Sequence, residues 1–224
     1  MRILIINPNS DPEMTAQIQE AADNYAAGDF EVVCRLTPGA PAFIETSNDV
    51  IQAAPGMVNL LVENEDQFDA IVVACHDDPN LDAMKELARK PVVGIGEASM
   101  RMASMLGHRF SVVTTAKHSI PAKEAQVRAL HLEGLLASVK APPEGLAGAS
   151  DDEKGLEAAR MALDEDMAEV IVLGCAGMSG RGRRISEALG APVLDGVVCA
   201  LIIVTGLVRY GVSTSKVRRY NLEY

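Results

Sequence analysis

Short runs of apolar and β-branched residues alternate along this chain with longer stretches of helical pattern. The first run, RILII at residues 2–6, is almost continuously apolar, as in a strand buried on both faces of a parallel sheet. Strands that alternate with helices favour parallel sheets covered by helices on both faces. The sequence therefore predicts an α/β protein, with further strands at 31–36, 70–74, 91–95, 110–114, 135–140, 170–173 and 192–194.

The stretches between these runs carry helix signals. The Asp-Pro pair at 11–12 has the pattern of an N-cap followed by the first helical residue, and the pair at 78–79 repeats it. Asp151 is the expected N-cap of a later helix, and the Pro-Gly pair at 55–56 is expected to break or kink an earlier one. The predicted helices are 11–26, 48–65, 97–106, 121–131, 151–166, 180–189 and 197–210.

The pattern of the first hundred residues is repeated in the second half of the chain. Cys75 and Cys175 each follow a predicted strand, and Pro91 and Pro192 each precede one, at spacings of 100 and 101 residues. No linker rich in Gly, Ser or Pro separates the halves, so we expect them to pack tightly. We predict two pseudo-symmetric Rossmann-like lobes, each a parallel sheet flanked by helices, with the active site between them. The expected lobes are 1–100 and 107–224, with the helix at 197–210 as a candidate to pack back on the first lobe.

Composition excludes several classes of function. The 224 residues include 20 Lys or Arg and 31 Asp or Glu, so the formal net charge of −11 disfavours a nucleic-acid partner. No apolar run reaches the roughly 18 residues that a membrane span needs, so we expect no membrane partner. The cysteines and histidines show neither CxxC nor HExxH spacing, which predicts no metal site. The start, MRILIINPNS, lacks the apolar core of a secretory signal, so we expect a cytoplasmic protein.

Two of the four cysteines occupy positions where α/β proteins carry out chemistry. Cys75 and Cys175 fall at the carboxyl ends of predicted strands, where the active residues of parallel sheets lie. A predicted helix follows each of them, and a helix N-terminus lowers the pKa of a nearby thiol, which can then act as a base or a nucleophile. The alternative is that they are small core residues, which is the reading we adopt for Cys34 and Cys199.

Other polar and small residues follow the same predicted strand ends. The segment 174–178 is rich in small residues that either expose backbone N–H groups to a ligand or form a tight turn. The asparagines at 7–10 either bind a ligand or close an Asx-turn. Thr114 and Thr115 end the strand that starts the second half, and His76 either assists Cys75 or is an exposed loop histidine. No Gly-rich pattern of a dinucleotide or nucleoside-triphosphate site is present.

These segments together resemble the hydantoin racemases, within the aspartate/glutamate racemase superfamily, over essentially the whole chain. Two residues beside Cys75 differ from the family pattern: His76 stands where Phe is frequent, and Asn80 where Gly is frequent. We therefore expect any departure from the family in the substrate rather than in the cysteine chemistry. The matching segments are NPNS at 7–10, FIETSNDV at 43–50, ACHDDPNL at 74–81, PVVGIGEA at 91–98, FSVVTT at 110–115, VLGCAGM at 172–178, APVLDGV at 191–197 and VSTSK at 212–216.

The resemblance implies a cofactor-independent racemase of 5-monosubstituted hydantoins, with allantoin as a special case. Cys75 and Cys175 would be the acid/base pair, one thiolate and one thiol on opposite faces of a planar carbanion. The resemblance further implies a small-molecule substrate and a homo-oligomer, with no cofactor. The residues implied in ligand binding are Asn9, His76, Asp77, Thr114, Thr115, Gly174, Ala176 and Gly177.

Other activities of the superfamily stay open at this point. An amino-acid racemase needs charged groups for the carboxylate and the ammonium, and near the cysteines the sequence offers only Lys117 and Arg181. A maleate cis–trans isomerase uses a cysteine as nucleophile, whereas the related arylmalonate decarboxylases keep one cysteine rather than two. A non-catalytic small-ligand binder on the same fold is the remaining alternative, and it does not require two thiols.

Overall fold

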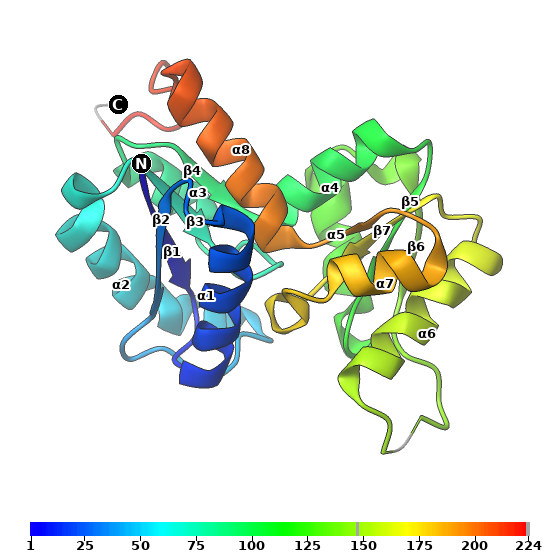
Figure 1. The fold of residues 1–224 in the computed structure, drawn as a ribbon. Coiled ribbons are helices and arrows are strands. Elements are labelled where there is room, and N and C mark those ends of the chain that lie inside the picture. Colours follow the sequence, from blue (N-terminus) through cyan, green and yellow to red (C-terminus); the bar gives the residue numbers. More distant parts are fainter. Residues whose placement is uncertain (147, 223–224) are drawn as a thin grey trace.

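The computed structural model describes residues 1–146 and 148–222, and Figure 1 shows two α/β lobes. Residue 147 and residues 223–224 lie outside the described residues. Each lobe contains one parallel four-stranded sheet, in the order β2-β1-β3-β4 in the first and β6-β5-β7-β8 in the second. The predicted fold class is therefore confirmed. The strands are β1 (Arg2–Asn7), β2 (Glu31–Leu36), β3 (Ala70–Val73), β4 (Val92–Gly94), β5 (Phe110–Val113), β6 (Leu136–Lys140), β7 (Val170–Leu173) and β8 (Val193–Leu194).

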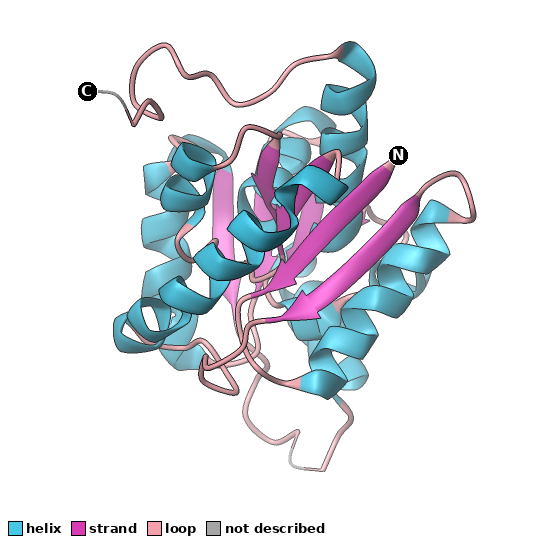
Figure 2. Ribbon diagram, turned by 90° about the vertical axis from the view of Figure 1, so that its left-hand side faces the viewer, coloured by secondary structure: helices cyan, strands magenta, loops and turns pink. Residues whose placement is uncertain are grey.

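Helices cover both faces of the first sheet, which is why its central strands are apolar throughout (Figure 2). Ile3 and Ile5 of β1 point to the face covered by α1 (Pro12–Ala26) and α8 (Gly196–Tyr210). Leu4 and Ile6 point to the opposite face, which is covered by α2 (Ser47–Asn64) and α3 (Leu81–Leu87). A continuous apolar run is thus the consequence of burial on two sides.

The second sheet repeats this arrangement. Phe110 and Val112 of β5 contact the core formed with α4 (Ile95–Leu106) and α5 (Ile120–Ala129), whereas Val113 packs with α6 (Asp151–Asp164) and α7 (Gly182–Leu189). Short 3₁₀ helices complete the chain: η1 (Glu65–Gln67), η2 (Lys117–Ser119), η3 (Glu133–Leu135) and η4 (Ala176–Met178).

The two halves of the chain exchange their last helices. Helix α4 follows the first sheet in sequence, yet Met100 and Ala103 pack against the second sheet. Helix α8 follows the second sheet, yet Leu201 and Val204 pack against the first. The two helices also contact each other, and a Cβ atom at Gly196 would lie 3.0 Å from that of Ile95. Neither sheet therefore has a complete core without a helix from the other half.

Several helix starts differ from the sequence prediction. Asp11 is the N-cap of α1, but Asp78 does not cap the helix that follows it, because α3 begins at Leu81 after a left-handed Asn80. Helix α6 is capped by the Ser150 hydroxyl, not by Asp151.

The Pro-Gly pair at 55–56 does not break α2, which is continuous from Ser47 to Asn64. Pro55 removes the helical donor of the Ile51 carbonyl, and Ile51 is 70% exposed, so water can take the place of that donor. In the described ranges, 1–146 and 148–222, no helix is long and apolar enough to cross a membrane.

Candidate active site

A cavity of about 380 Å³ lies where the carboxyl ends of β1 and β3 meet those of β5 and β7. In each sheet, these are the two strands at which the strand order changes direction, the usual place for a ligand in an α/β fold. All ten residues singled out from the sequence line this one cavity. They are Asn9, Cys75, His76, Asp77, Thr114, Thr115, Gly174, Cys175, Ala176 and Gly177.

The two cavity cysteines have matching surroundings. Cys75 lies just after β3 and Cys175 just after β7, and each side chain is partly buried. The backbone N–H two residues further on, from Asp77 and from Gly177, donates to the respective sulfur. By contrast, Cys199 is buried in the apolar core of the first lobe.

The expectation that helix N-termini lower the pKa of these thiols is wrong. Burial raises the pKa of Cys75 to about 12, and burial also raises the pKa of Cys175. Along the described chain, the α-helix after Cys75 starts only at Leu81, and Cys175 is followed directly by the three-residue η4. A negative charge on Cys175 raises the pKa of Cys75 further, so the two thiols influence each other across the cavity.

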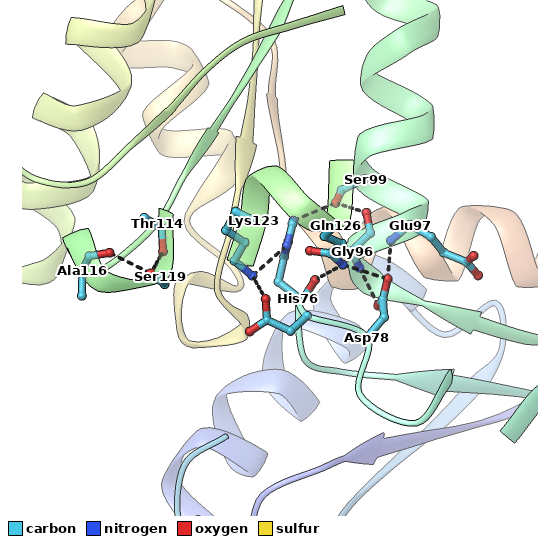
Figure 3. Close-up of polar contacts among 11 residues, drawn as sticks. His76, Asp78, Gly96, Glu97, Ser99, Thr114, Ala116, Ser119, Lys123 and Gln126 are labelled. Atoms are coloured by element: carbon cyan, nitrogen blue, oxygen red, sulfur yellow. Dashed lines mark hydrogen bonds and ion pairs between the residues drawn. The ribbon is translucent and has the colours of Figure 1, made fainter. Parts of the chain in front are cut away.

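His76 is buried, not exposed as is usual for a loop histidine, and its ring joins two other side chains (Figure 3). Its Nδ1 accepts a hydrogen bond of 3.1 Å from the Lys123 ammonium, and its Nε2 lies 3.3 Å from the Ser99 hydroxyl. Since an ammonium can only donate, Nε2 carries the proton. Burial, followed by the charge of Lys123, holds the pKa of His76 well below its usual range, so the ring is neutral.

Lys123 of α5 is buried with its charge paired. Its ammonium lies 2.7 Å from Asp77 Oδ1, and only 4% of its side chain is exposed, against 36% for Asp77. The bond crosses between the lobes, because α5 belongs to the second sheet and Asp77 follows β3 of the first. The sequence analysis missed Lys123. Its spacing from Ile120 and Val127, which places it on the apolar face of its helix, is the signal that could have found it.

Asp78 caps the N-terminus of α4, a helix that does not directly follow it in the sequence (Figure 3). Its carboxylate accepts from the backbone N–H groups of Gly96 at 2.9 Å and Glu97 at 2.6 Å, which are the first turn of α4. Gln126 of α5 donates to the His76 carbonyl at 2.6 Å and to Asp78 at 3.2 Å. The segment after Cys75 is thereby held by two helices that cover the second sheet.

The predicted ligand-holding residues present different groups to the cavity. Asn9 uses its side-chain oxygen within the turn, accepting from Asn7 Nδ2 at 2.7 Å and from the Asp11 N–H at 3.0 Å. The Nδ2 group of Asn9 lies 3.1 Å from the thioether sulfur of Met14, which is a weak acceptor. The Thr114 hydroxyl bonds to Ser119 at 2.7 Å, whereas Thr115 is exposed on the cavity wall.

Gly174 serves the packing of the second sheet. Its N–H donates to the Val113 carbonyl at 2.7 Å, and a Cβ atom there would lie 2.8 Å from both Val112 and Val113. At Gly177 a Cβ atom would lie 3.6 Å from Cys175 Sγ, which is ordinary contact. The small residue is therefore required at 174 by a neighbouring strand, while at 177 it leaves room beside the thiol.

The sequence does not predict the rest of the cavity wall, apart from Arg181, a charge near the cysteines, and Met178 of the small-residue segment. These wall residues form an apolar part and a polar part. The apolar part is Met14, Phe43, Ile44, Ala74, Ala122, Pro142, Gly155 and Met178, and the polar part is Glu45, His118, Ser119, Lys123, Asp151, Lys154 and Arg181. Among the residues the structure describes, no group of three or more His, Cys, Asp or Glu side chains could hold a metal ion.

The fold and the site place this chain in a known class: residues 3–202 match the Asp/Glu/Hydantoin racemase family, and the chain belongs to that family. The resemblance inferred from the sequence is confirmed. The chain is 39% identical over 228 residues to a hydantoin racemase of Paenarthrobacter aurescens, covering 98% of this chain and 96% of that protein. It is 38% identical over 226 residues to a hydantoin racemase of Pseudomonas sp. (strain NS671), covering 98% and 91%.

Solved structures agree with these relatives. The allantoin racemase from Klebsiella pneumoniae superposes with a TM-score of 0.91 at 35% sequence identity, over 98% of this chain and 92% of that one. The allantoin racemase from Pseudomonas fluorescens gives a TM-score of 0.90 at 35% identity, over 98% and 96%. The similarity therefore extends over both lobes and the cavity between them.

Proposed function

We propose that this protein is a racemase of 5-monosubstituted hydantoins, allantoin included, which works without a cofactor by passing protons between two cysteines. The observation that carries the proposal is that equivalent positions of the two lobes each supply one thiol, Cys75 and Cys175, to a single cavity. The related hydantoin and allantoin racemases, similar over almost the whole chain, support the substrate class.

In the proposed reaction one cysteine is a thiolate and the other a thiol. The thiolate removes the proton at C5 of the ring, and the electron pair of that C–H bond moves onto the neighbouring carbonyl as an enolate. The thiol on the opposite face then delivers its proton to C5 and becomes the thiolate. The configuration at C5 is now inverted, and the two cysteines have exchanged protonation states, so the enzyme is ready for the reverse direction.

The enolate and the ring amides need donors and acceptors that are already in place. Asn9 Nδ2, which contacts the thioether sulfur of Met14, a weak acceptor, can donate to a ring carbonyl, and the Thr115 hydroxyl lies on the cavity wall. A single lost donor to a developing oxyanion typically costs on the order of 100-fold in rate. We assign the neutral His76, Thr114 and the segment 174–177 to shaping the wall around the ring.

The same proposal includes a cytoplasmic location and a homo-oligomer. All four cysteines are free thiols, which suits a reducing compartment. Large apolar side chains are exposed on α2, α4 and α8, which suits contact with a second copy; they include Ile51, Val62, Met105, Leu106 and Ile202.

A substrate panel in D₂O tests the proposal. Proton NMR and optical rotation are followed for enantiopure 5-benzylhydantoin, 5-isopropylhydantoin, allantoin, L-aspartate, L-glutamate and maleate. We expect enzyme-dependent loss of the C5–H signal together with optical rotation for a hydantoin. Exchange confined to an amino acid, or conversion of maleate to fumarate, would instead assign a sister activity.

Replacement of either cavity cysteine tests their assignment. We expect Cys75→Ser and Cys175→Ser each to lower racemisation by roughly 100- to 10,000-fold, because each removes one of the two proton-transfer groups. Cys34→Ser serves as the matched control, since Cys34 lies in β2, away from the cavity wall. Full racemase activity in either cavity variant, with the fold intact by circular dichroism, refutes the assignment.

A further inference from the structure

We propose that Lys123 is a positioning residue which stabilises the thiolate form of both Cys75 and Cys175, with Asp77 as the opposing charge that limits this effect. The inference rests on the proposed function and deepens it. The cysteine pair alone does not explain how a negatively charged thiolate is stabilised among buried groups.

The geometry fixes the Lys123 ammonium at the wall of the cavity. The residue is 3% exposed, and its Nζ is held by Asp77 Oδ1 at 2.7 Å and by His76 Nδ1 at 3.1 Å (Figure 3). Both partners lie within two residues of Cys75, while Lys123 itself comes from α5 of the other lobe. An ammonium group has three N–H donors, and Asp77 and His76 accept from two of them. The direction of the third donor is therefore fixed by these two bonds.

The other cations on the cavity wall are placed differently. Arg181 pairs with Asp152 at 3.1 Å, and Lys154 lies 3.7 Å from Asp151, with both Lys154 and Arg181 more exposed than Lys123. The charge of Lys123 lowers the pKa of Cys75 and also that of Cys175, whereas Arg181 acts on Cys175. The Asp77 carboxylate raises the pKa of both thiols; its effect is larger than that of Lys123 at Cys75 and smaller than that of Lys123 at Cys175.

Action on both thiols is what a racemase requires. In the proposed mechanism the thiolate alternates between Cys75 and Cys175 with every turnover. A cation near one cysteine alone would trap the charge there and slow one direction. Lys123 lines the same cavity as both cysteines and is fixed there by its bond across the lobes to Asp77. Other charged or titratable groups lie around the two cysteines and Lys123. They are His76, Asp77 and Asp78 after β3, Glu97 of α4, and Arg181 after η4.

The test measures the ionisation of each thiol directly. Rates of iodoacetamide alkylation are determined against pH, with Cys75 and Cys175 quantified separately by mass spectrometry in the full chain. We expect Lys123→Met to raise the midpoint of both cysteines, seen as an alkylation rate about tenfold or more lower at each pH below the midpoint, because a nearby opposite charge is lost. We expect Asp77→Asn to lower both midpoints, since the opposing charge is lost instead. A purely structural role for this pair predicts no such opposite shifts.

Kinetics and conservative variants complete the design. For Lys123→Met we expect kcat at neutral pH to fall about tenfold or more and to recover as pH rises, with KM little changed. Lys123→Arg keeps the charge and should retain the midpoints of the unmodified chain. Lys117→Gln is the matched control, because Lys117 is an exposed lysine of the same lobe, paired with Glu144 at 2.7 Å.

The proposal is overturned if a variant shifts the midpoint of only one cysteine or of neither. It is also overturned if Lys123→Met and Asp77→Asn shift the midpoints in the same direction. If Lys123→Met does not fold, Asp77→Asn and Lys123→Arg decide: unchanged midpoints in Asp77→Asn overturn it, and lowered ones support it. Because alkylation needs no substrate, a chain that fails to racemise hydantoins yet shows these shifts refutes the proposed function and not the role of Lys123.

Discussion

Burial raises the pKa of both cavity thiols, and this determines how the site handles protons. When the pKa of a thiol is high, its thiolate is a strong base, which suits removal of a proton from carbon. Only a small fraction of the protein then carries the thiolate at neutral pH. The polar contacts around Cys75 and Cys175, from the N–H groups of Asp77 and Gly177 to the charge of Lys123, act against this burial.

The direction of the pKa shift predicts the pH dependence of activity. Because the pKa of Cys75 is raised to about 12, the thiolate fraction of the free enzyme increases with pH throughout the neutral range. We expect kcat/KM to rise roughly tenfold per pH unit between pH 6 and 8, the limit for a single ionisation well below its pKa. C5–H exchange in D₂O, corrected for the rate without enzyme, measures this profile, and a flat or falling profile contradicts it.

Among the elements, the segment between Cys75 and α3 depends on contacts that are remote in sequence. Asp78 caps α4 instead of α3, and Gly96 lets the segment approach. A Cβ atom at Gly96 would overlap the His76 carbonyl oxygen and would lie 2.5 Å from Gln126 Nε2 and 2.8 Å from Asp78 Oδ2. The absence of a side chain at position 96 is therefore what allows the loop carrying Cys75 to rest on α4.

This close approach predicts opposite effects for two glycine substitutions within helices. We expect Gly96→Ala to lower the free energy of unfolding by about 1–3 kcal/mol and to impair activity, since the loop beside Cys75 must shift. Gly206→Ala in α8 has no atom within 4 Å of its new Cβ, so it should stabilise by about 0.5–1 kcal/mol and leave activity unchanged. Urea unfolding of both variants is the measurement, and equal effects would contradict the account.

The elements also show where sequence reasoning succeeded and where it stopped. Strands such as β1 and β7 are predictable because burial on two faces leaves a local mark, a continuous apolar run. The cap made by Asp78 is not, because the N–H groups that it accepts from lie eighteen and nineteen residues later and an Asp-Pro pair looks the same in either role. Lys123 is likewise one of several charges on its helix until the fold sets it against Asp77.

At the scale of the whole molecule, the exchange of helices joins the two lobes into one unit. Helix α4 completes the core of the second sheet and α8 that of the first, so the lobes are held in a fixed relation at their shared edge (Figure 1). The sequence predicts equivalent lobes and offers the helix at 197–210 as a candidate to pack on the first, but it carries no local signal that α4 packs on the second sheet. The consequence of the exchange is that Cys75 and Cys175 face one cavity from two sides.

The location of deuterium in early racemisation tests the two-cysteine account most directly. One hydantoin enantiomer is incubated with the enzyme in D₂O to low conversion, and the two enantiomers are separated and analysed by mass spectrometry. A thiol that carries a single hydrogen returns substrate hydrogen to its own face, while the opposite cysteine supplies solvent deuterium. We predict deuterium at C5 of the product and almost none in the remaining substrate. Equal labelling of both enantiomers, or product that keeps the original hydrogen, would contradict the account.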